Sequence, residues 1–267
     1  MTIKLRGRLF WTFAAISAAG LIMAVLTIWM LGTSNLERVR TYDFGSLNTR
    51  AFYTVLSAAA ACGIFSATVS GLIAFKSGKT VSVEIFFFAL WALCQGFELV
   101  KFGSLALSSA GAGLDTFEIV TRAALFGRYA GTIAIFAGSL FSVGLKQERG
   151  LPVLAVTLLS GLLFASIHPL NSVGPGPDFL ADRGLVSLAR AFELAVIIMA
   201  LLNYAIAYRA SRDKAHLQAG LGLTLCVSAS VVLRVSASPW VVAIAVPVLG
   251  LGAWVYLKSM HEYYLWR

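Results

Sequence analysis

The sequence is poor in charge, cysteine and histidine. Only 12% of its 267 residues are Asp, Glu, Lys or Arg, whereas 59% are hydrophobic, and its mean hydropathy is +0.84. A soluble domain carries about 25% charged residues, so an ordinary cytosolic protein is excluded. A disordered chain, a collagen-like chain and a disulfide-rich secreted module are excluded as well. The composition predicts a polytopic membrane protein with little mass outside the bilayer.

The few cysteines and histidines are not arranged for metal or redox chemistry. Cys62, Cys94 and Cys226 lie in apolar runs without a Cys-x-x-Cys motif, and we expect them to pack as small hydrophobic residues. His216 and His261 flank the inner ends of the last two apolar runs, which is a poor placement for a bis-histidine haem. We therefore expect no cofactor and no metal.

Long apolar runs are what the sequence has in abundance. A helix needs about 20 predominantly apolar residues to cross a bilayer, and eight such runs predict an all-α membrane bundle that is a single domain over residues 1–267. The first run is about 24 residues long, whereas the apolar core of a cleavable signal has about 7–15, so we expect this helix to be retained. A seven-span alternative has 217–236 flat or re-entrant. The predicted spans are approximately 9–32, 51–75, 85–108, 121–145, 151–170, 185–208, 217–236 and 239–257.

The distribution of basic residues predicts the orientation, because Lys and Arg collect in cytoplasmic loops. With the N-terminus inside, 12 basic residues are cytoplasmic and 4 (Arg38, Arg40, Arg50 and Arg183) are in outer loops. Both termini are therefore expected on the cytoplasmic side of the inner, or plasma, membrane. The same distribution accounts for the net charge of +9, so no nucleic-acid partner is expected. The longest loops are 33–50 and 171–184, and the second is dense in turn-forming residues.

Seven charged residues remain inside the predicted spans, where ionisable groups are costly and mark functional sites. Depths counted at about 1.5 Å per residue place all seven between the midplane and the outer surface, although they come from helices of alternating direction. His168, at the outer end of its span, joins this layer. The seven residues are Glu98, Lys101, Arg122, Arg128, Arg190, Glu193 and Arg234.

Local spacing predicts how some of these charges interact. Glu98 and Lys101 are three residues apart, as are Arg190 and Glu193, so each pair lies on one helix face. Five cations then face two carboxylates, which leaves a surplus of three positive charges. Three interpretations stay open: an ion-pair network that locks the bundle, a cavity that binds a carboxylate, phosphate or lipid head group, or a proton or ion pathway. Gly127 and Gly131 form a GxxxG motif that predicts close approach of another helix.

Two segments resemble the seven-helix membrane sensor modules that precede bacterial histidine kinases. Phe88–Leu99 contains a Trp and a Glu-Leu pair, and Arg122 is followed by Phe126–Gly131, an aromatic-small run around Arg128. The chain differs from those modules by an extra first helix and by the absence of a kinase segment up to Arg267. The resemblance implies ligand sensing through the membrane bundle, with the output passed to a partner protein.

The favoured hypothesis is a non-enzymatic inner-membrane protein that binds an anionic small molecule or lipid in its outer half. It would act as a receptor-like module or as a subunit of a larger complex, with protein partners or further copies of itself. Lys101, Arg128 and Arg190 would contact the anion, Arg122, Arg234 and His168 would line the site, and Glu98 and Glu193 would hold the cations. The first alternative is a small transporter, which would need a polar path on the inner side, and the sequence shows none. The second is a membrane-embedded hydrolase or transferase in which His168 acts with Asp178 or Asp182 and with Ser166 or Ser187.

Overall fold

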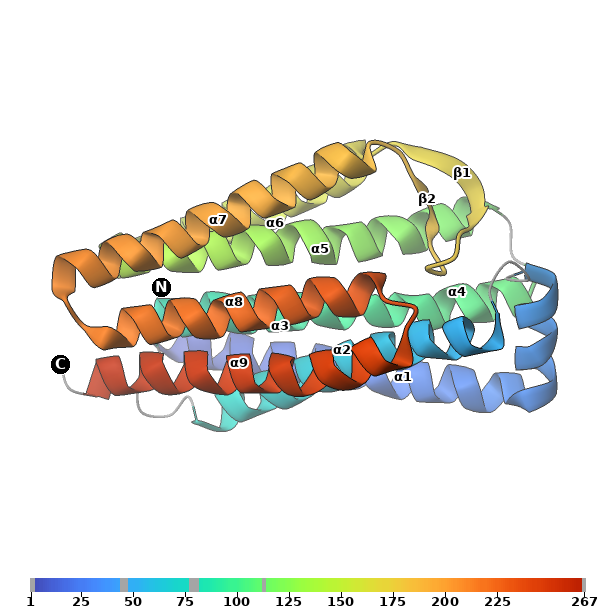
Figure 1. Cartoon of the computed structure of the whole chain (residues 1–267), viewed down its shortest axis with the longest axis horizontal. Coiled ribbons are helices and arrows are strands. Elements are labelled where there is room, and N and C mark those ends of the chain that lie inside the picture. The colour runs from blue at the N-terminus through green and yellow to red at the C-terminus, as the bar shows by residue number, and fades with distance from the viewer. Residues whose placement is uncertain (1–2, 44–47, 77–81, 112–113, 266–267) are drawn as a thin grey trace.

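A computed structural model shows an elongated bundle of antiparallel helices (Figure 1). It describes residues 3–43, 48–76, 82–111 and 114–265. The described chain has nine α-helices, two 3-10 turns (η1, η2) and two short strands. They are α1 (Ile3–Asp43), α2 (Thr49–Lys76), α3 (Val83–Gln95), η1 (Gly96–Leu99), α4 (Val100–Ser109), α5 (Leu114–Ser142), η2 (Gln147–Arg149), α6 (Gly150–Ile167), β1 (Leu170–Pro175), β2 (Ala181–Arg183), α7 (Val186–Ser211), α8 (Lys214–Val235) and α9 (Pro239–Leu265).

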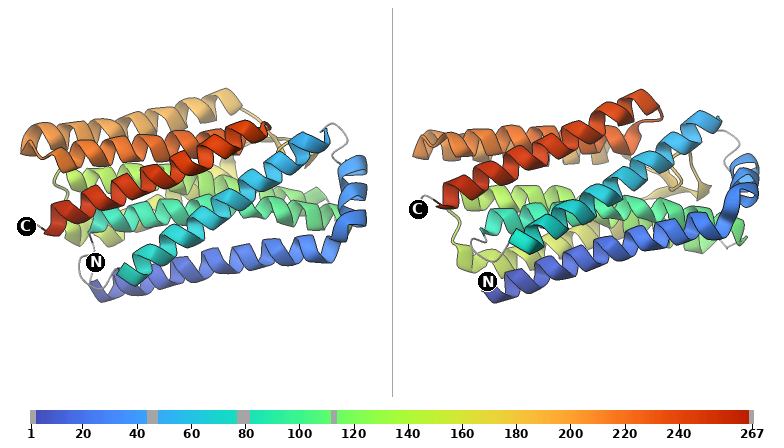
Figure 2. Two further views of the ribbon diagram at one scale, coloured as in Figure 1. Left: turned by 60° about the horizontal axis from the view of Figure 1, so that its bottom comes forward. Right: turned by 90° about the horizontal axis from the view of Figure 1, so that it is seen from below.

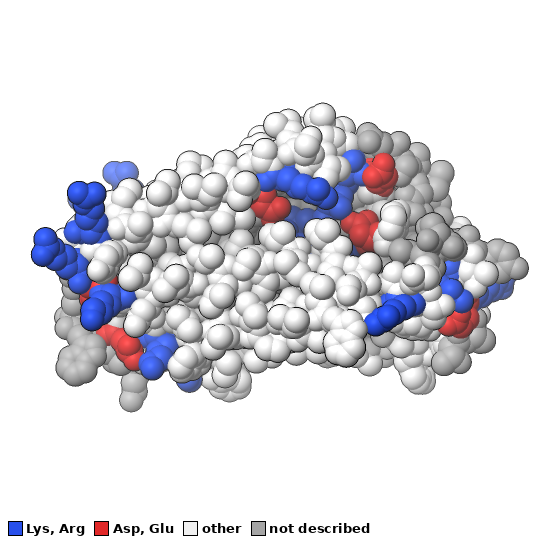
Figure 3. Space-filling view, in the orientation of Figure 1, with Lys and Arg blue, Asp and Glu red and all other residues white. Residues whose placement is uncertain are grey.

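The prediction of eight spans is confirmed. Eight helical segments are long and apolar enough to cross a membrane, and their limits lie within seven residues of those predicted. α3, η1 and α4 together make one of them, and α8 is a full-length helix beside α9 rather than a flat segment. Both termini lie at the same end of the bundle (Figure 1), as an even number of crossings requires. Lys and Arg side chains gather at that end (Figure 3). The side of the membrane remains a prediction.

Two segments that we expected to be loops have regular structure. The first part of 33–50 continues α1 to Asp43, after a kink at Gly32, whose φ of 61° suits glycine. Figure 2 shows this last part of α1 turning across the end of the bundle. It is helical because it is amphipathic: Leu36 and Val39 are buried, while Glu37 pairs with Arg40 one turn away.

The second of these segments, 171–184, forms an antiparallel hairpin of β1 and β2. Its turn returns to the bundle, where Phe179 and Leu180 are fully buried and Phe179 meets the ring of Phe52 on α2 edge-on. The Ala181 backbone N–H donates to the Thr121 hydroxyl of α5 at 2.9 Å. The hairpin thus covers the end of the bundle that is opposite the termini (Figure 1).

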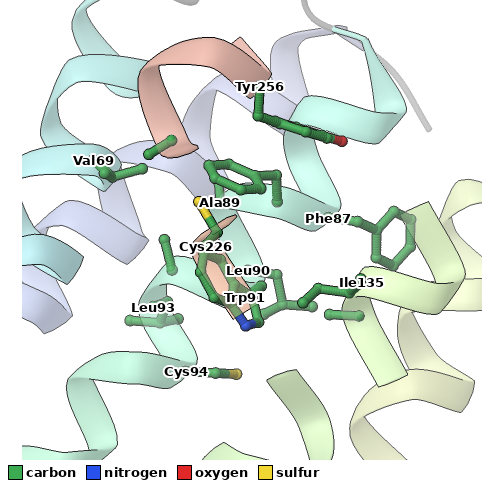
Figure 4. Close-up of a cluster of buried hydrophobic side chains, with 14 of the residues drawn as sticks. Val69, Phe87, Ala89, Leu90, Trp91, Leu93, Cys94, Ile135, Cys226 and Tyr256 are labelled. Atoms are coloured by element: carbon green, nitrogen blue, oxygen red, sulfur yellow. The ribbon is translucent and has the colours of Figure 1, made fainter. Parts of the chain in front are cut away.

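The core surrounds α3, in which every residue from Val83 to Gln95 is buried. Such a helix is hydrophobic on all sides because other helices surround it. Figure 4 shows Phe87, Leu90 and Trp91 of this helix among side chains of neighbouring helices. Trp91 is therefore a packing residue, and the three cysteines are buried as predicted.

The GxxxG motif brings α5 onto α3, as predicted. A Cβ atom added to Gly127 would lie 2.5 Å from the Phe97 Cβ and 2.9 Å from the Cys94 carbonyl oxygen. At Gly131 the same atom would lie 3.0 Å from the Cys94 Cβ. Only glycine permits this approach, which places Arg128 directly opposite η1.

Candidate functional site

Glu98 is the centre of a buried ion cluster. It lies in η1, where the third span leaves the α-helical path for four residues. Lys101 Nζ is 2.8 Å from Glu98 Oε2, so the predicted pairing over three residues is confirmed. From α5, Arg128 donates from Nε to Oε1 at 2.8 Å and from Nη2 to Oε2 at 3.2 Å. The side chains of Glu98, Lys101 and Arg128 are only 4%, 1% and 13% exposed.

This arrangement leaves a positive charge uncompensated inside the bundle. Glu98 carries one negative charge, while Lys101 and Arg128 carry two positive charges that both bind it. Removing ions from water costs several kcal/mol each, and their mutual attraction repays this only when charges and hydrogen bonds are matched. A net positive charge in a region of low dielectric therefore attracts an anion.

A second ion pair lies beside the first. Arg234 of α8 donates from Nη2 to Glu193 Oε1 of α7 at 2.8 Å, and the Thr132 hydroxyl of α5 is 3.5 Å from the same oxygen. Arg234 is near enough for its charge to act on Glu98. We call these five residues, Glu98, Lys101, Arg128, Glu193 and Arg234, the charge cluster.

Arg190 does not make the predicted contact with Glu193. Glu193 forms its ion pair with Arg234 instead. Arg190 is exposed and forms no ion pair with any described acidic residue. The reason is the rotation of α7, which turns Glu193 toward α8 and leaves Arg190 at the surface. Charged side chains of both signs gather on this face between α7 and α8 (Figure 3).

Arg122 lies apart from the charge cluster, which corrects the predicted surplus. It binds Glu118 one turn earlier, with Nε 2.8 Å from Oε1, and donates to the carbonyl oxygens of Ala165 and Ser166. These carbonyls are at the C-terminal end of α6, where cations are favoured. Arg122 thus fastens α5 to α6. With Glu118 counted, the surplus falls from three positive charges to two: one at Glu98 and one at Arg190.

His168 is buried among aromatic rings rather than among the charges. Its Nδ1 is 2.7 Å from the Tyr129 hydroxyl, and Phe164 and Phe192 lie against Tyr129. Two of the partners considered for a hydrolytic site are engaged elsewhere: Asp178 pairs with Arg183 at 2.7 Å, and the Ser166 hydroxyl donates to the Leu162 carbonyl. His168 therefore contacts Tyr129 rather than Asp178 or Ser166.

Burial lowers the pKa of His168 below its usual range; a hydrogen bond with the Gly184 backbone opposes this shift, and the charges of Arg122 and Arg128 add to it. The folded protein then holds a neutral imidazole that the unfolded chain protonates as the pH falls through about 6.5. The unfolded state binds more protons there, so stability is lost with falling pH. We expect the melting temperature to drop between about pH 7.5 and pH 5.5, and His168→Phe to flatten this drop. His261→Gln, at an exposed position, is the control, and an unchanged pH profile in His168→Phe would contradict the assignment.

The sequence analysis missed a second polar cluster, at the end of the bundle where the termini lie. Glu84 is 2% exposed, and its Oε1 accepts a hydrogen bond from the Tyr264 hydroxyl at 2.7 Å. The Tyr256 hydroxyl is 2.8 Å from that of Tyr204 and 3.5 Å from the Glu84 carbonyl oxygen. Buried Arg6 is near enough for its charge to act on Glu84. The predicted third span begins at residue 85 and leaves Glu84 in a loop, whereas α3 begins at Val83 and buries Glu84 in its first turn.

Glu84 and Glu98 are thus two buried carboxylates of one membrane span, Glu84 at its end near the termini and Glu98 just past its middle. They are 14 positions apart in the sequence, which corresponds to about 21 Å at the rise of a helix. The intervening part of α3 is the apolar core around Leu90 and Trp91 shown in Figure 4. The bundle therefore holds one polar site near the middle of this span and another at its end near the termini, with an apolar segment between them.

Fold and site together define a multi-pass helical membrane protein with a net-positive buried ion cluster. Comparison with known proteins adds no family: no protein-family model matches the chain, and no curated protein matches it. The function is therefore argued from the geometry of the charge cluster.

Proposed function

We propose that the chain is a receptor-like membrane protein that binds an anion beside the charge cluster, in the half of the bundle farther from the termini. The observation that supports this most directly is the sharing of one buried carboxylate, Glu98, by two buried cations, Lys101 and Arg128. A carboxylate or phosphate group close to them would supply the missing negative charge. Arginine suits this role because its planar guanidinium can bind either group through two hydrogen bonds.

The geometry gives the predicted site residues different parts in this proposal. Arg190 is exposed on α7, three residues before Glu193, so we assign it the first contact with the anion. Arg128 and Arg234 contact the anion next; Arg128 is held in place by Glu98, and Arg234 by Glu193. Lys101 is 1% exposed and cannot reach a ligand, so it contributes its charge rather than a contact.

Binding is proposed to be passed to a partner protein, as the resemblance to sensor modules implies. The two segments that carry this resemblance contact each other: Glu98 of the first binds Arg128 of the second. An anion that draws Arg128 away from Glu98 would loosen α5 from η1. The movement of α5 could then be transmitted to the end of the bundle that bears the termini.

The test is the variant Arg128→Gln. It leaves Glu98 paired with Lys101, so the cluster becomes neutral and folding is expected to persist. We expect the affinity for inorganic phosphate or succinate, measured by isothermal titration of the purified protein, to fall about tenfold. Arg190→Gln should weaken binding as well, whereas Arg40→Gln, in an exposed pair with Glu37, should not.

Two results would contradict the proposal. One is a wild-type protein that binds neither phosphate, succinate nor vesicles containing phosphatidylglycerol. The other is an Arg128→Gln protein whose yield and melting temperature fall sharply, because the surplus charge would then be part of the fold. Vesicle binding without phosphate or succinate binding would identify the anion as a lipid head group.

Transport of the anion is the second candidate function, and the polar cluster around Glu84 is the observation that favours it. A transporter needs polar groups on both sides of its apolar centre, and Glu84, Tyr256 and Tyr264 provide them on the side of the termini. Uptake of labelled phosphate or succinate into proteoliposomes would favour transport. Binding without uptake would favour reception.

A further inference from the structure

An apolar groove runs between α1 and the third span, on residues that take no part in the charge cluster. It has a volume of about 310 Å³. Its floor includes the buried residues Ala24, Leu99 and Phe102, and exposed Met23 lies at its edge. At this place α1 presents small side chains at helical spacing, among them Ser17 and Gly20, which keep the groove open.

The groove continues into a second, more polar cavity of about 700 Å³. Thr27 lines both, so the two form one path along α1 and α4. The polar cavity lies at the end of α4 and extends along α1 on both sides of the Gly32 kink. Its polar lining comes from Asn35 and Arg38 on α1 and from Ser108 and Ser109 on α4.

We propose that this path binds one membrane phospholipid with an anionic head group. The acyl chain would occupy the groove between α1 and α4, and the phosphate would lie at Arg38 with the serine hydroxyls beside it. Among the described acidic residues none pairs with Arg38, so its guanidinium can bind phosphate through two hydrogen bonds. The acyl chain would thus contact the apolar groove, and the phosphate would contact the polar cavity.

The change of polarity along the path favours a phospholipid over another helix. An apolar membrane helix in the groove would supply no anion to Arg38 in the polar cavity. A phospholipid supplies both an apolar chain and a phosphate. This inference is independent of the proposed function because no residue of the charge cluster lines the path.

Gly103 allows the groove to be filled without disturbing the fold. A Cβ atom at this α4 residue would meet nothing within 4 Å, so Gly103→Leu should place its side chain in the groove. Gly71→Leu, on α2 outside the groove, is the matched control because its Cβ atom also meets nothing within 4 Å. Arg38→Gln removes the proposed phosphate contact, with Arg40→Gln as its control.

The measurement is native mass spectrometry of the detergent-purified full chain titrated with phosphatidylglycerol or phosphatidylcholine. We expect a single phosphatidylglycerol to bind about tenfold more tightly than phosphatidylcholine. Gly103→Leu and Arg38→Gln should each weaken it about tenfold, and Gly71→Leu and Arg40→Gln should not. Equal binding of the two lipids, or unchanged binding in Gly103→Leu, would overturn the proposal. A wild-type dimer that Gly103→Leu converts to a monomer would overturn it too, because the groove would then hold a second copy.

Discussion

Glu98→Leu is expected to destabilise the folded bundle by about 3–5 kcal/mol, the cost of breaking a buried ion pair by removing one partner. The effect is large because Glu98 serves two cations, and Lys101 and Arg128 would both keep their charges in a buried position without a counter-charge. The expected result is a strongly lowered melting temperature in tryptophan fluorescence, and a small monodisperse fraction in size-exclusion chromatography.

The control for this variant is Glu37→Leu. Glu37 also pairs with an arginine three residues away, but the Glu37 side chain is 47% exposed. An exposed pair contributes about 0–1 kcal/mol, so this variant should keep a melting temperature close to that of the wild type. If the Glu98→Leu protein were as stable as the Glu37→Leu protein, Lys101 and Arg128 would have to be compensated by other groups. The proposed surplus charge at Glu98 would then be wrong.

Gly252→Leu is expected to separate α8 from α9, the two helices that are in closest contact. A Cβ atom at Gly252 would lie 2.8 Å from the Cys226 backbone nitrogen and 2.8 Å from the Gly222 carbonyl oxygen. Both are backbone atoms of α8, so no side-chain rotation can make room, and the helices must move apart. Overpacking of this kind costs about 1–3 kcal/mol or more, which again lowers the melting temperature.

Gly250 supplies the matched control, two residues away on the same helix. A Cβ atom there meets nothing within 4 Å, so Gly250→Leu should fold like the wild type. Because α8 carries Arg234, the Gly252→Leu protein should also bind the anion less well, if it can be purified. Equal stability of the two variants would show that the α8–α9 contact does not hold the bundle together.

Some of the site could be predicted because it depends on local spacing. Glu98 and Lys101 lie three residues apart on one helix, so their contact follows from the helix itself. The glycine spacing at Gly127 likewise indicated the close approach that brings Arg128 to Glu98. In both cases the information is contained in a single helical segment.

Other contacts could not be predicted because they depend on how each helix is rotated about its axis. The same spacing of three residues suggested a pair of Arg190 and Glu193, but α7 presents Glu193 to Arg234 of α8. Arg122 donates to carbonyl groups at the end of α6, which become its neighbours only when α5 and α6 pack. The buried position of Glu84 depends on Tyr264, 180 residues later in the chain.

The sequence alone determined the membrane class, the eight spans and the presence of charges within them. The physical reason is that a bilayer requires about 20 apolar residues for each crossing. A charged residue within such a run is costly and therefore rare, so it is easily recognised in the sequence. Only the tertiary structure decided which charges share a partner, which face the surface, and that a second polar cluster surrounds Glu84. Those features arise from contacts between helices distant in sequence, and hydrophobic burial, which is not directional, does not specify them in advance.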